Sequence, residues 1–418
     1  MSEEVVAQRP AVTRTAWIRL AVCTAIAALL QADGTIIAVA LPSVGSAFEV
    51  TAQTASWLLT AYFATYAIGL FPGGRLVDRF GPGQVAVAGL TLFCVGTLLG
   101  ALADSFGLLA GSRVIQGAGA GLASPAALVG AVSGFPAERR GTALGIWGAA
   151  SGLSNLVGPL LGGALTETWG WRANWWALLP LALLTVASVL RWVPRTAAAV
   201  PDVPAERPPG PAERPVMTTV HAASSAAALT FAMMIGTFFA VEQYLQHAAG
   251  YGALAAASAP MLVALCIGAA GPVAGRLTDR FGDRVPALAG FLACAVAFAI
   301  YALPFSPLHG LALLPGGVLL GAGLGLLFPS TSRAALNSTP ESLHGRASAQ
   351  LSFGRLAGAA AGATLAGLAF RDGVTADHLH TALAGCAVLS VLGVALVALR
   401  FPGATDGKHE KHPGRPGR

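Results

Sequence analysis

Long apolar runs separated by short polar segments extend along almost the whole chain. Each run is about 20 residues long, which is enough for one helix to cross the ~30 Å hydrocarbon layer of a bilayer. In that layer the backbone must be paired internally, as it is in a helix. The pattern predicts an all-α integral membrane protein with twelve transmembrane helices, at residues 16–42, 52–73, 84–102, 106–131, 141–165, 174–193, 218–247, 253–275, 285–304, 309–332, 345–369 and 380–400.

The charged residues set the orientation predicted for these helices. Apolar residues make up 55% of the 418 residues and charged ones 11%, which is too little charge to cover a soluble protein. Of the 25 Lys and Arg residues, 21 lie in segments that share one side of the membrane, while Arg172 and Arg371 lie in loops on the other. Because positively charged loops face the cytoplasm, we expect both termini on the cytoplasmic side of a plasma membrane. The basic excess thus indicates topology rather than nucleic-acid binding.

One octapeptide occurs twice, at an interval close to half the chain length. Gly74–Gly81 reads GRLVDRFG, and Gly275–Gly282 reads GRLTDRFG 201 residues later. Each copy follows one predicted span and precedes the next. Such a repeat indicates two parallel six-helix halves, a known transporter architecture. We expect the halves at residues 1–193 and 217–402, a proline-rich cytoplasmic linker at 194–216 and a polar tail at 403–418.

Two of the nineteen acidic residues, Asp33 and Glu242, lie within predicted spans. A carboxylate there costs about 2.5–3.5 kcal/mol, so it needs a partner, a proton or a function. At 1.5 Å per residue, Asp33 lies roughly 13 Å and Arg113 roughly 10 Å from the outer side, within reach of each other. They form either a permanent ion pair or a site where Asp33 alternates between Arg113 and a proton, and we hypothesise the second. Glu242 is either a residue at the outer mouth or a second proton or cation site.

Seven segments, in chain order, resemble motifs of the major facilitator superfamily, and specifically of its drug:proton antiporters. They are Gln31–Pro42, Trp57–Tyr62, Gly74–Gly81, Arg113–Gly117, a fifth-span set (Gly145, Gly152, Gly158, Pro159, Gly162 and Gly163), Gly321–Pro329 and Gly345–Gly362. Together they span nearly the full chain and are similar to the branch that usually has fourteen helices. Here a linker stands in place of two helices, Pro82-Gly83 replaces a basic pair and Ser154 replaces a glycine, so the resemblance leaves the substrate open.

The resemblance implies roles for three groups of residues. The octapeptides would be gating loops, with Asp78 and Asp279 facing the N-termini of the eleventh and fifth spans; topogenic charge alone is the alternative. Gly158-Pro159 would bend the fifth helix for alternating access, or would only permit tight packing. The gating residues would be Gly74, Asp78, Arg79, Gly275, Asp279 and Arg280, and the substrate cavity would be lined by Trp57, Tyr62, Tyr66, Gln116, Trp147, Asn155, Phe238 and Arg355.

The function that these expectations favour is proton-coupled efflux of small lipophilic molecules such as drugs or antibiotics, including cations. A proton symporter for uptake is the first alternative, although the fifth-span pattern is typical of exporters. A membrane binding or sensor protein is the second, but it would not need Asp33 and Arg113 at matched depth. No nucleophile–base pair or metal-ligand cluster indicates an enzyme. We expect no metal and no cofactor, a proton gradient as the energy source, and a monomer.

Overall fold

The computed structural model describes residues 12–50, 52–194, 214–251, 258–302, 313–371 and 373–401. Within these ranges it contains twelve α-helices and two single-turn 3₁₀ helices, η1 (Ala137–Arg139) and η3 (Glu341–Leu343). Most of the predicted linker and the predicted tail lie outside the described residues. The α-helices are α1 (Arg14–Ala47), α2 (Ala52–Phe80), α3 (Pro82–Ala101), α4 (Phe106–Val132), α5 (Arg140–Trp169), α6 (Arg172–Trp192), α7 (Arg214–His247), α9 (Ser258–Phe281), α10 (Arg284–Tyr301), α11 (Leu313–Asn337), α12 (His344–Ala369) and α13 (Ala376–Arg400).

Nine of the described helices are long and apolar enough to cross a membrane. The three that fall short of this measure are α2, α5 and α12, which are rich in glycine and polar residues. Each of these helices also packs against the other half of the chain, α2 against α12 and α5 against α9. A helix covered by protein needs less apolar surface than one covered by lipid. That all twelve cross the membrane therefore stays a prediction.

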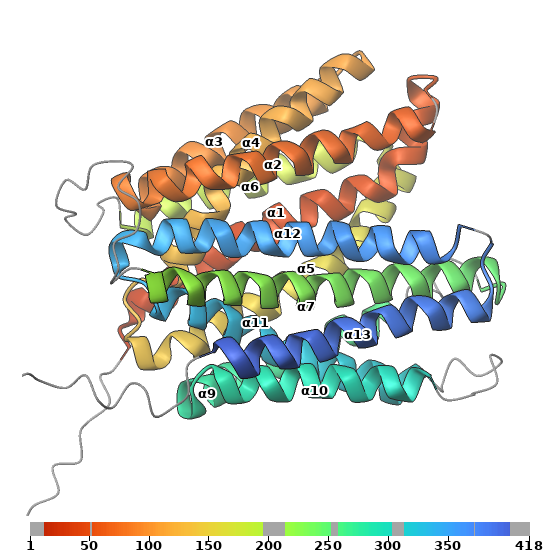
Figure 1. The fold of residues 1–418 in the computed structure, drawn as a ribbon. Helices are drawn as coiled ribbons and strands as arrows, with labels where there is room; N and C mark the ends of the chain where they lie inside the picture. Colours follow the sequence, from red (N-terminus) through yellow and green to blue (C-terminus); the bar gives the residue numbers. More distant parts are fainter. Residues whose placement is uncertain are drawn as a thin grey trace, which may run out of the picture.

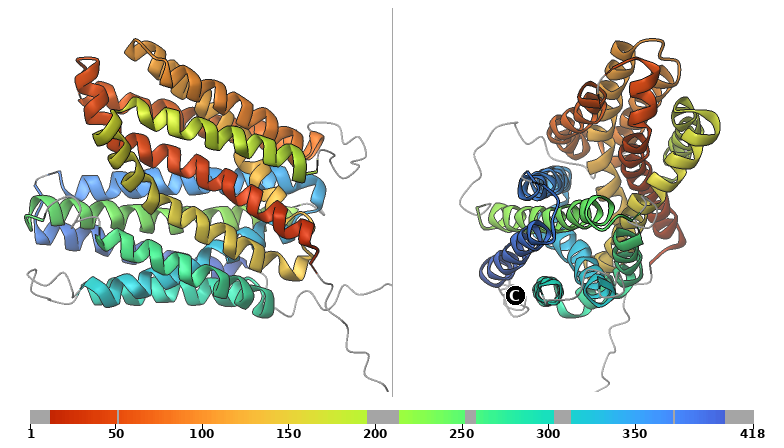
Figure 2. Two further views of the ribbon diagram at one scale, coloured as in Figure 1. Left: turned by 180° about the vertical axis from the view of Figure 1, so that it is seen from behind. Right: turned by 90° about the vertical axis from the view of Figure 1, so that its right-hand side faces the viewer.

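The helices form two sets that follow the order of the chain (Figure 1). We call α1–α6 the first set and α7 with α9–α13 the second set. Within the first set α2 packs on α4 and α1 on α5, and within the second set α7 packs on α12 and α9 on α11. Figure 2 shows the same division from behind and from one end, with the sets side by side. Contacts between α2 and α12 and between α5 and α9 join them.

Both octapeptides are helical, so the prediction that they form loops is wrong. Residues 74–80 make the last turns of α2, and residues 275–281 make the last turns of α9. Only the final glycines leave the helix, Gly81 with φ 85° and Gly282 with φ 79°. A positive φ of this size favours glycine, which explains why each copy ends on this residue. The helices therefore continue beyond the apolar stretch that the sequence marks as a span.

One end of the bundle carries both octapeptides, and we call it the motif end. There the helices of the two sets meet, whereas toward the other end they spread apart (Figure 1). Close packing at the motif end depends on glycine, because a Cβ atom on Gly74 would lie 2.5 Å from the Gly345 carbonyl oxygen. A Cβ atom on Gly275 would lie 2.8 Å from the Thr142 Cα atom. The two sets are thus in backbone contact at this end.

Candidate functional site

A buried ion pair lies between α1 and α4. Asp33 of α1 and Arg113 of α4 are both 0% exposed. Arg113 Nη1 donates to Asp33 Oδ2 at 2.8 Å and to Oδ1 at 3.0 Å. The depths estimated from the sequence predicted that these residues could meet, and they do. A single buried charge would be unfavourable, so each of the two residues compensates the charge of the other.

Neighbouring polar groups hold this pair in place. Gln116 accepts a hydrogen bond from Arg113 Nη1 at 2.8 Å and donates through Nε2 to the Thr97 hydroxyl at 3.0 Å. Arg113 Nε donates to the Leu58 carbonyl at 3.3 Å, and its guanidinium carbon lies 4.3 Å from the centroid of the Tyr62 ring. Arg113 Nη2 is buried and has no hydrogen-bond partner among the described residues. Sequence reasoning missed Thr97, because one hydroxyl in an apolar span forms no recognisable pattern.

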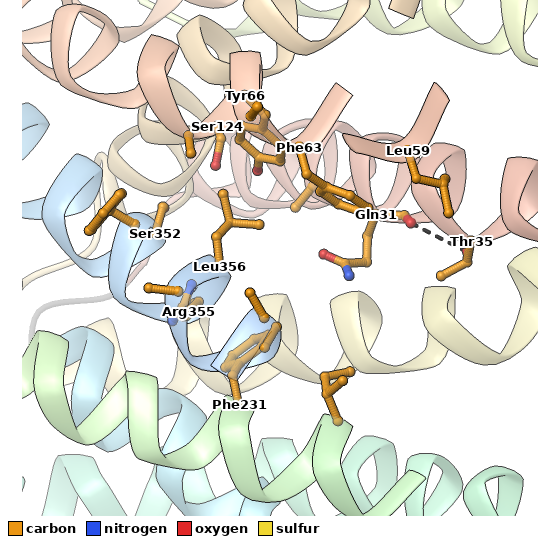
Figure 3. Close-up of a pocket in the computed structure, with 18 of the residues that line it drawn as sticks. Gln31, Thr35, Leu59, Phe63, Tyr66, Ser124, Phe231, Ser352, Arg355 and Leu356 are labelled. Atoms are coloured by element: carbon orange, nitrogen blue, oxygen red, sulfur yellow. Dashed lines mark hydrogen bonds between the residues drawn. The ribbon is translucent and has the colours of Figure 1, made fainter. Parts of the chain in front are cut away.

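A cavity of about 700 Å³ lies between the two helix sets. It is lined by residues of α1, α2, α4 and α5 from the first set and of α7, α11 and α12 from the second. Six of the described lining residues are aromatic, among them Phe63, Phe231 and Phe328. Figure 3 shows the amide of Gln31 pointing into this space, and Arg355 projecting from α12. The volume and the mostly apolar wall are typical of a site for a small organic molecule.

Three predicted residues, Tyr66, Trp147 and Arg355, line this cavity. Tyr62 and Gln116 do not, because both are fully buried. They surround the arginine of the buried pair instead of facing the space between the sets. In this structure they belong to the ion-pair cluster, and contact with substrate stays a prediction.

Two further aromatic residues also lie away from the cavity, contrary to prediction. Trp57 is 60% exposed, and Phe238 packs against the apolar core. Neither is among the described lining residues. The sequence gives the depth of a residue along its helix but not the direction in which its side chain points. The side chain of Asn155 lies outside the part of the chain that the structure describes.

Arg355 is the charged residue among the described lining residues. It is 7% exposed, and its Nη2 donates to the Ser332 hydroxyl at 2.6 Å. Its guanidinium carbon lies 5.0 Å from the Trp147 ring centroid and 5.9 Å from that of Phe231. No ion pair involves Arg355 in the described ranges. The described wall also contains no acid, so it does not support the expected cationic substrates.

Glu242 lies apart from both the ion pair and the cavity. Its carboxylate accepts a hydrogen bond from Gln246 Nε2 at 3.1 Å, one turn further along α7. It is not among the described residues that line the cavity. The structure therefore does not bring Glu242 together with Asp33, and a role in proton or cation binding stays a prediction.

Glycines of α5 bring this helix close to α1, the helix that carries Asp33. A Cβ atom on Gly162 would lie 2.8 Å from the Ile36 carbonyl oxygen, and Gly158 and Gly163 also face α1. The nearest groups lie two to six residues beyond Asp33, so α5 packs against the segment that follows the carboxylate. Close backbone contact between membrane helices is a usual role of small residues.

The remaining predicted residues of the fifth span give a mixed result. Gly145 faces the backbone of α9 at Gly271, so this glycine serves the contact between the sets. The surroundings of Gly152 and of the Pro159 ring lie outside the described part. The helix α5 runs without interruption from Arg140 to Trp169. A bending role for Gly158-Pro159 stays a prediction.

Two aspartates join the helix sets at the motif end. Asp279 Oδ1 accepts the N–H of Gly141 at 2.8 Å, and Oδ2 accepts the N–H of Thr142 at 2.8 Å together with its hydroxyl. Asp78 Oδ1 accepts the N–H of Gly345 at 2.6 Å, and Oδ2 accepts the next N–H at 3.2 Å. Each carboxylate binds at the first turn of a helix in the other set, where N–H groups lack intrahelical partners.

The two arginines predicted to act in gating do not share this arrangement. The guanidinium carbons of Arg79 and Arg280 lie 5.2 Å from the ring centroids of Phe80 and Phe281, their own neighbours in the chain. Neither arginine forms an ion pair across the sets in the described residues. The aspartates and glycines, rather than these arginines, therefore make the contact.

Acids at the motif end have raised pKa values. Burial raises the pKa of Asp78 to about 7, against the opposing effect of the Gly345 and Arg346 N–H groups and the Arg346 charge. Burial likewise raises the pKa of Asp283 to about 6, although Arg333 Nη1 lies 3.0 Å from its Oδ1. Carboxyl groups at this end therefore titrate closer to neutral pH than exposed acids do.

Known proteins share both the sequence pattern and the arrangement of helices. The Major Facilitator Superfamily model matches residues 23–363 and 224–417. The uncharacterized MFS-type transporter Rv1250 of Mycobacterium tuberculosis is 37% identical over 40% of this chain, a match that spans 29% of that protein. The multidrug efflux pump LfrA of Mycolicibacterium smegmatis is 27% identical over 95% of this chain and 90% of its own. The solved structure of the proton:xylose symporter XylE, 16% identical, has the same fold with a TM-score of 0.74 over 94% of this chain and 97% of that one. The chain belongs to the Major Facilitator Superfamily and is a multi-pass membrane transporter rather than an enzyme.

Proposed function

We propose that this transporter exports small lipophilic molecules from the cytoplasm in exchange for protons, by alternating access. The observation that carries the proposal is the position of the buried Asp33–Arg113 pair beside the cavity. Gln31 and Thr35, two residues to either side of Asp33 on α1, both line the cavity. A substrate that displaces this segment of α1 would therefore move the carboxylate relative to its arginine.

The cluster can hold or release a proton without leaving Arg113 unsupported. When Asp33 takes up a proton it loses the charge that binds Arg113. The guanidinium still donates to Gln116 and to the Leu58 carbonyl, and still lies against the Tyr62 ring. One proton that moves down 100 mV releases about 2.3 kcal/mol, which supports a substrate gradient near fifty-fold.

In this proposal the motif end faces the cytoplasm, because most of the Lys and Arg residues lie in segments assigned to that side. The contacts of Asp78 and Asp279 close this end, and the sets spread apart toward the other (Figure 1). The conformation is then the one that exchanges substrate with the outside. Opening of the motif end would break the helix caps that the two aspartates provide.

The relatives favour export over uptake. LfrA, which matches nearly all of this chain, is named a multidrug efflux pump. XylE is named a proton:xylose symporter, but at 16% identity it supports the fold alone. Uptake by proton symport on this fold is the second candidate, and one experiment separates the two.

That experiment uses inside-out vesicles with an acidic lumen and a fluorescent reporter of the pH gradient. A panel of lipophilic compounds is added to wild type, to Asp33→Asn and to the control Asp104→Asn, which removes an exposed acid of the same helix set. For an antiporter, at least one compound dissipates the gradient with wild type and with the control, and Asp33→Asn lowers the rate by at least about tenfold. Substrate accumulation only in right-side-out vesicles with acid outside would establish symport. No response to any compound, with folded protein present, would contradict transport of this class.

A further inference from the structure

We infer that the preferred substrates are lipophilic molecules that carry an acidic group, and that Arg355 binds this group in the cavity. The inference rests on the proposed export function only in that it names what is exported. Binding of such a molecule can be measured without any transport, so the two proposals can fail separately.

The first step is the contrast between the two buried arginines. Arg113 has a carboxylate, an amide oxygen and a carbonyl within hydrogen-bond distance. Arg355 has one hydroxyl and two aromatic faces as described partners. A guanidinium carries several N–H donors in a planar fork that matches a carboxylate, and most of those of Arg355 are not used by the described residues.

Ser332 positions Arg355 without neutralising it. The Ser332 hydroxyl donates its proton to the Phe328 carbonyl at 2.7 Å, so its oxygen is an acceptor for Arg355 Nη2. The Ser332 hydroxyl and the Phe328 carbonyl are both uncharged, so the positive charge of Arg355 remains directed at the cavity. A buried cation without a counter-ion is unfavourable, and an anion that enters the cavity relieves that cost.

The second step is the charge of the rest of the wall. The described lining residues include glutamine, serine, threonine and tyrosine but no aspartate or glutamate. Asp33 is fully buried against Arg113, so this acid is compensated before any ligand binds. Glu242 accepts a hydrogen bond from Gln246 and is not among the described lining residues. The field inside the cavity is thus positive, which favours anions and disfavours cations.

The third step gives the shape of the ligand. Trp147 and Phe231 flank the Arg355 guanidinium, and Phe63, Phe328 and Phe353 add further rings to the wall. Figure 3 shows Phe231 on one side of the space, with Phe63 and Tyr66 across from it. A flat aromatic body fits between such rings, with its acidic substituent at the arginine. Aromatic carboxylates and acidic phenols are the chemical class that this arrangement selects.

The membrane potential assists the export of this class. An inside-negative potential of 100 mV favours outward movement of one negative charge by about fifty-fold, in addition to the proton that moves inward. A cation would be opposed by the same factor. In each exchange the potential therefore favours both the outward movement of the anion and the inward movement of the proton.

The test is a binding measurement on purified protein with three ligands of one skeleton. These are 9-anthracenecarboxylate, 9-anthracenecarboxamide and 9-anthracenylmethylammonium, and anisotropy of the anthracene fluorescence gives each Kd. The variants are Arg355→Gln, which removes the charge, and Arg355→Lys, which keeps it but loses the fork. The matched control is Arg191→Gln, because Arg191 also lies over a tryptophan ring, that of Trp192 at 4.3 Å, but is exposed and outside the cavity.

We expect wild type and the control to bind the carboxylate at least tenfold more tightly than the ammonium. Arg355→Gln should weaken carboxylate binding at least tenfold and change amide binding less than threefold, with Arg355→Lys in between. Equal loss of all three ligands in Arg355→Gln would mean a structural role and overturn the inference, as would preference of wild type for the ammonium or no binding of the carboxylate. Should Arg355→Gln fail to fold, the Lys variant and the wild-type ranking decide. Arg355-dependent carboxylate binding without proton exchange would leave this inference intact and remove the export function, whereas proton-coupled export of cations would do the reverse.

Discussion

Both copies of the octapeptide form the last turns of a helix, yet the carboxylates of their aspartates, Asp78 and Asp279, have different partners. Asp279 accepts three hydrogen bonds from residues 141 and 142, and Arg333 Nε lies 3.8 Å from its Oδ1. Asp78 accepts two, and its basic neighbour Arg346 is 54% exposed at 3.6 Å. The second copy thus has the firmer contact between the helix sets.

The reason for the difference lies outside the repeat itself. Arg333 of α11 donates to the Thr278 carbonyl at 2.7 Å and to Asp283 at 3.0 Å, so it ties the end of α9 to the start of α10. In the first copy, Pro82 stands 201 residues before Asp283, and it offers no charge to such a network. The comparison teaches that a repeated motif gives the geometry of a contact, while unrepeated neighbours set its strength.

The largest effect is expected where both copies depend on backbone contact. Alanine at Gly74 or Gly275 would place a Cβ atom against backbone atoms of the opposite set, which cannot move aside as a flexible side chain does. Overpacking of this kind costs about 1–3 kcal/mol, which lowers the ratio of closed to open motif end by roughly 5- to 150-fold. Distances between spin labels at the exposed positions 79 and 280 measure this ratio. Equal distance distributions for wild type and both variants would contradict backbone contact as the basis of closure.

Particular residues show why the sequence predicted only part of this arrangement. Rise per residue gave the depths of Asp33 and Arg113, so their contact was predictable, and 201 residues after Asp33 stands buried Met234, so the ion pair has no twin. Direction around a helix was not predictable, which is why Gln116 was expected in the cavity. The octapeptides were expected to be loops because the apolar stretches end before them. The end of an apolar stretch marks the lipid boundary, however, and the helices continue beyond it to Phe80 and Phe281.

The next effect should separate the copies. Both carboxylate oxygens of Asp279 accept hydrogen bonds, and Asp279→Asn replaces one of them with an NH₂ group. The N–H group that faced this oxygen then loses its acceptor, which destabilises the closed form by about 1–3 kcal/mol. Asp78→Asn can keep the shorter bond, 2.6 Å to Gly345, and loses only the longer one. We expect a fall of roughly 5- to 150-fold in the closed-to-open ratio for Asp279→Asn, and less than about fivefold for Asp78→Asn. Substrate affinity should be unchanged in both, because neither acid lines the described cavity. A larger effect at Asp78 would reverse the ranking of the two contacts.

A smaller effect concerns pH and the first copy. The pKa of Asp78 is raised to about 7 in the closed form, whereas a solvated aspartate has a pKa of about 3.9. The raised value means that closure takes up a proton, so its contribution to the closed form is fully present below pH ~4 and is lost as the pH rises through ~7. Between pH 8 and pH 6 the closed-to-open ratio should increase about tenfold. Spin-label distances across this range test the sign, and Asp78→Asn should reduce the dependence to the part contributed by Asp279 and Asp283, whose pKa values burial also raises. A ratio that falls on acidification would show that the buried carboxylate is stabilised in its ionised form.

The smallest effect is expected for the ion pair that links the two helix starts. Arg140 Nη2 lies 3.1 Å from Glu341 Oε1, but the Glu341 side chain is 69% exposed, and exposed pairs contribute less than about 1 kcal/mol. Glu341→Gln should change the closed-to-open ratio less than about fivefold, and high salt should remove the difference from wild type, since salt screens exposed charges. Arg140→Gln should have the larger effect, because Arg140 is mostly buried and also donates to Asn337 at 3.2 Å. The comparison of the copies depends on this order: if Glu341→Gln matched Asp279→Asn, surface charge and not the buried helix caps would hold the motif end closed.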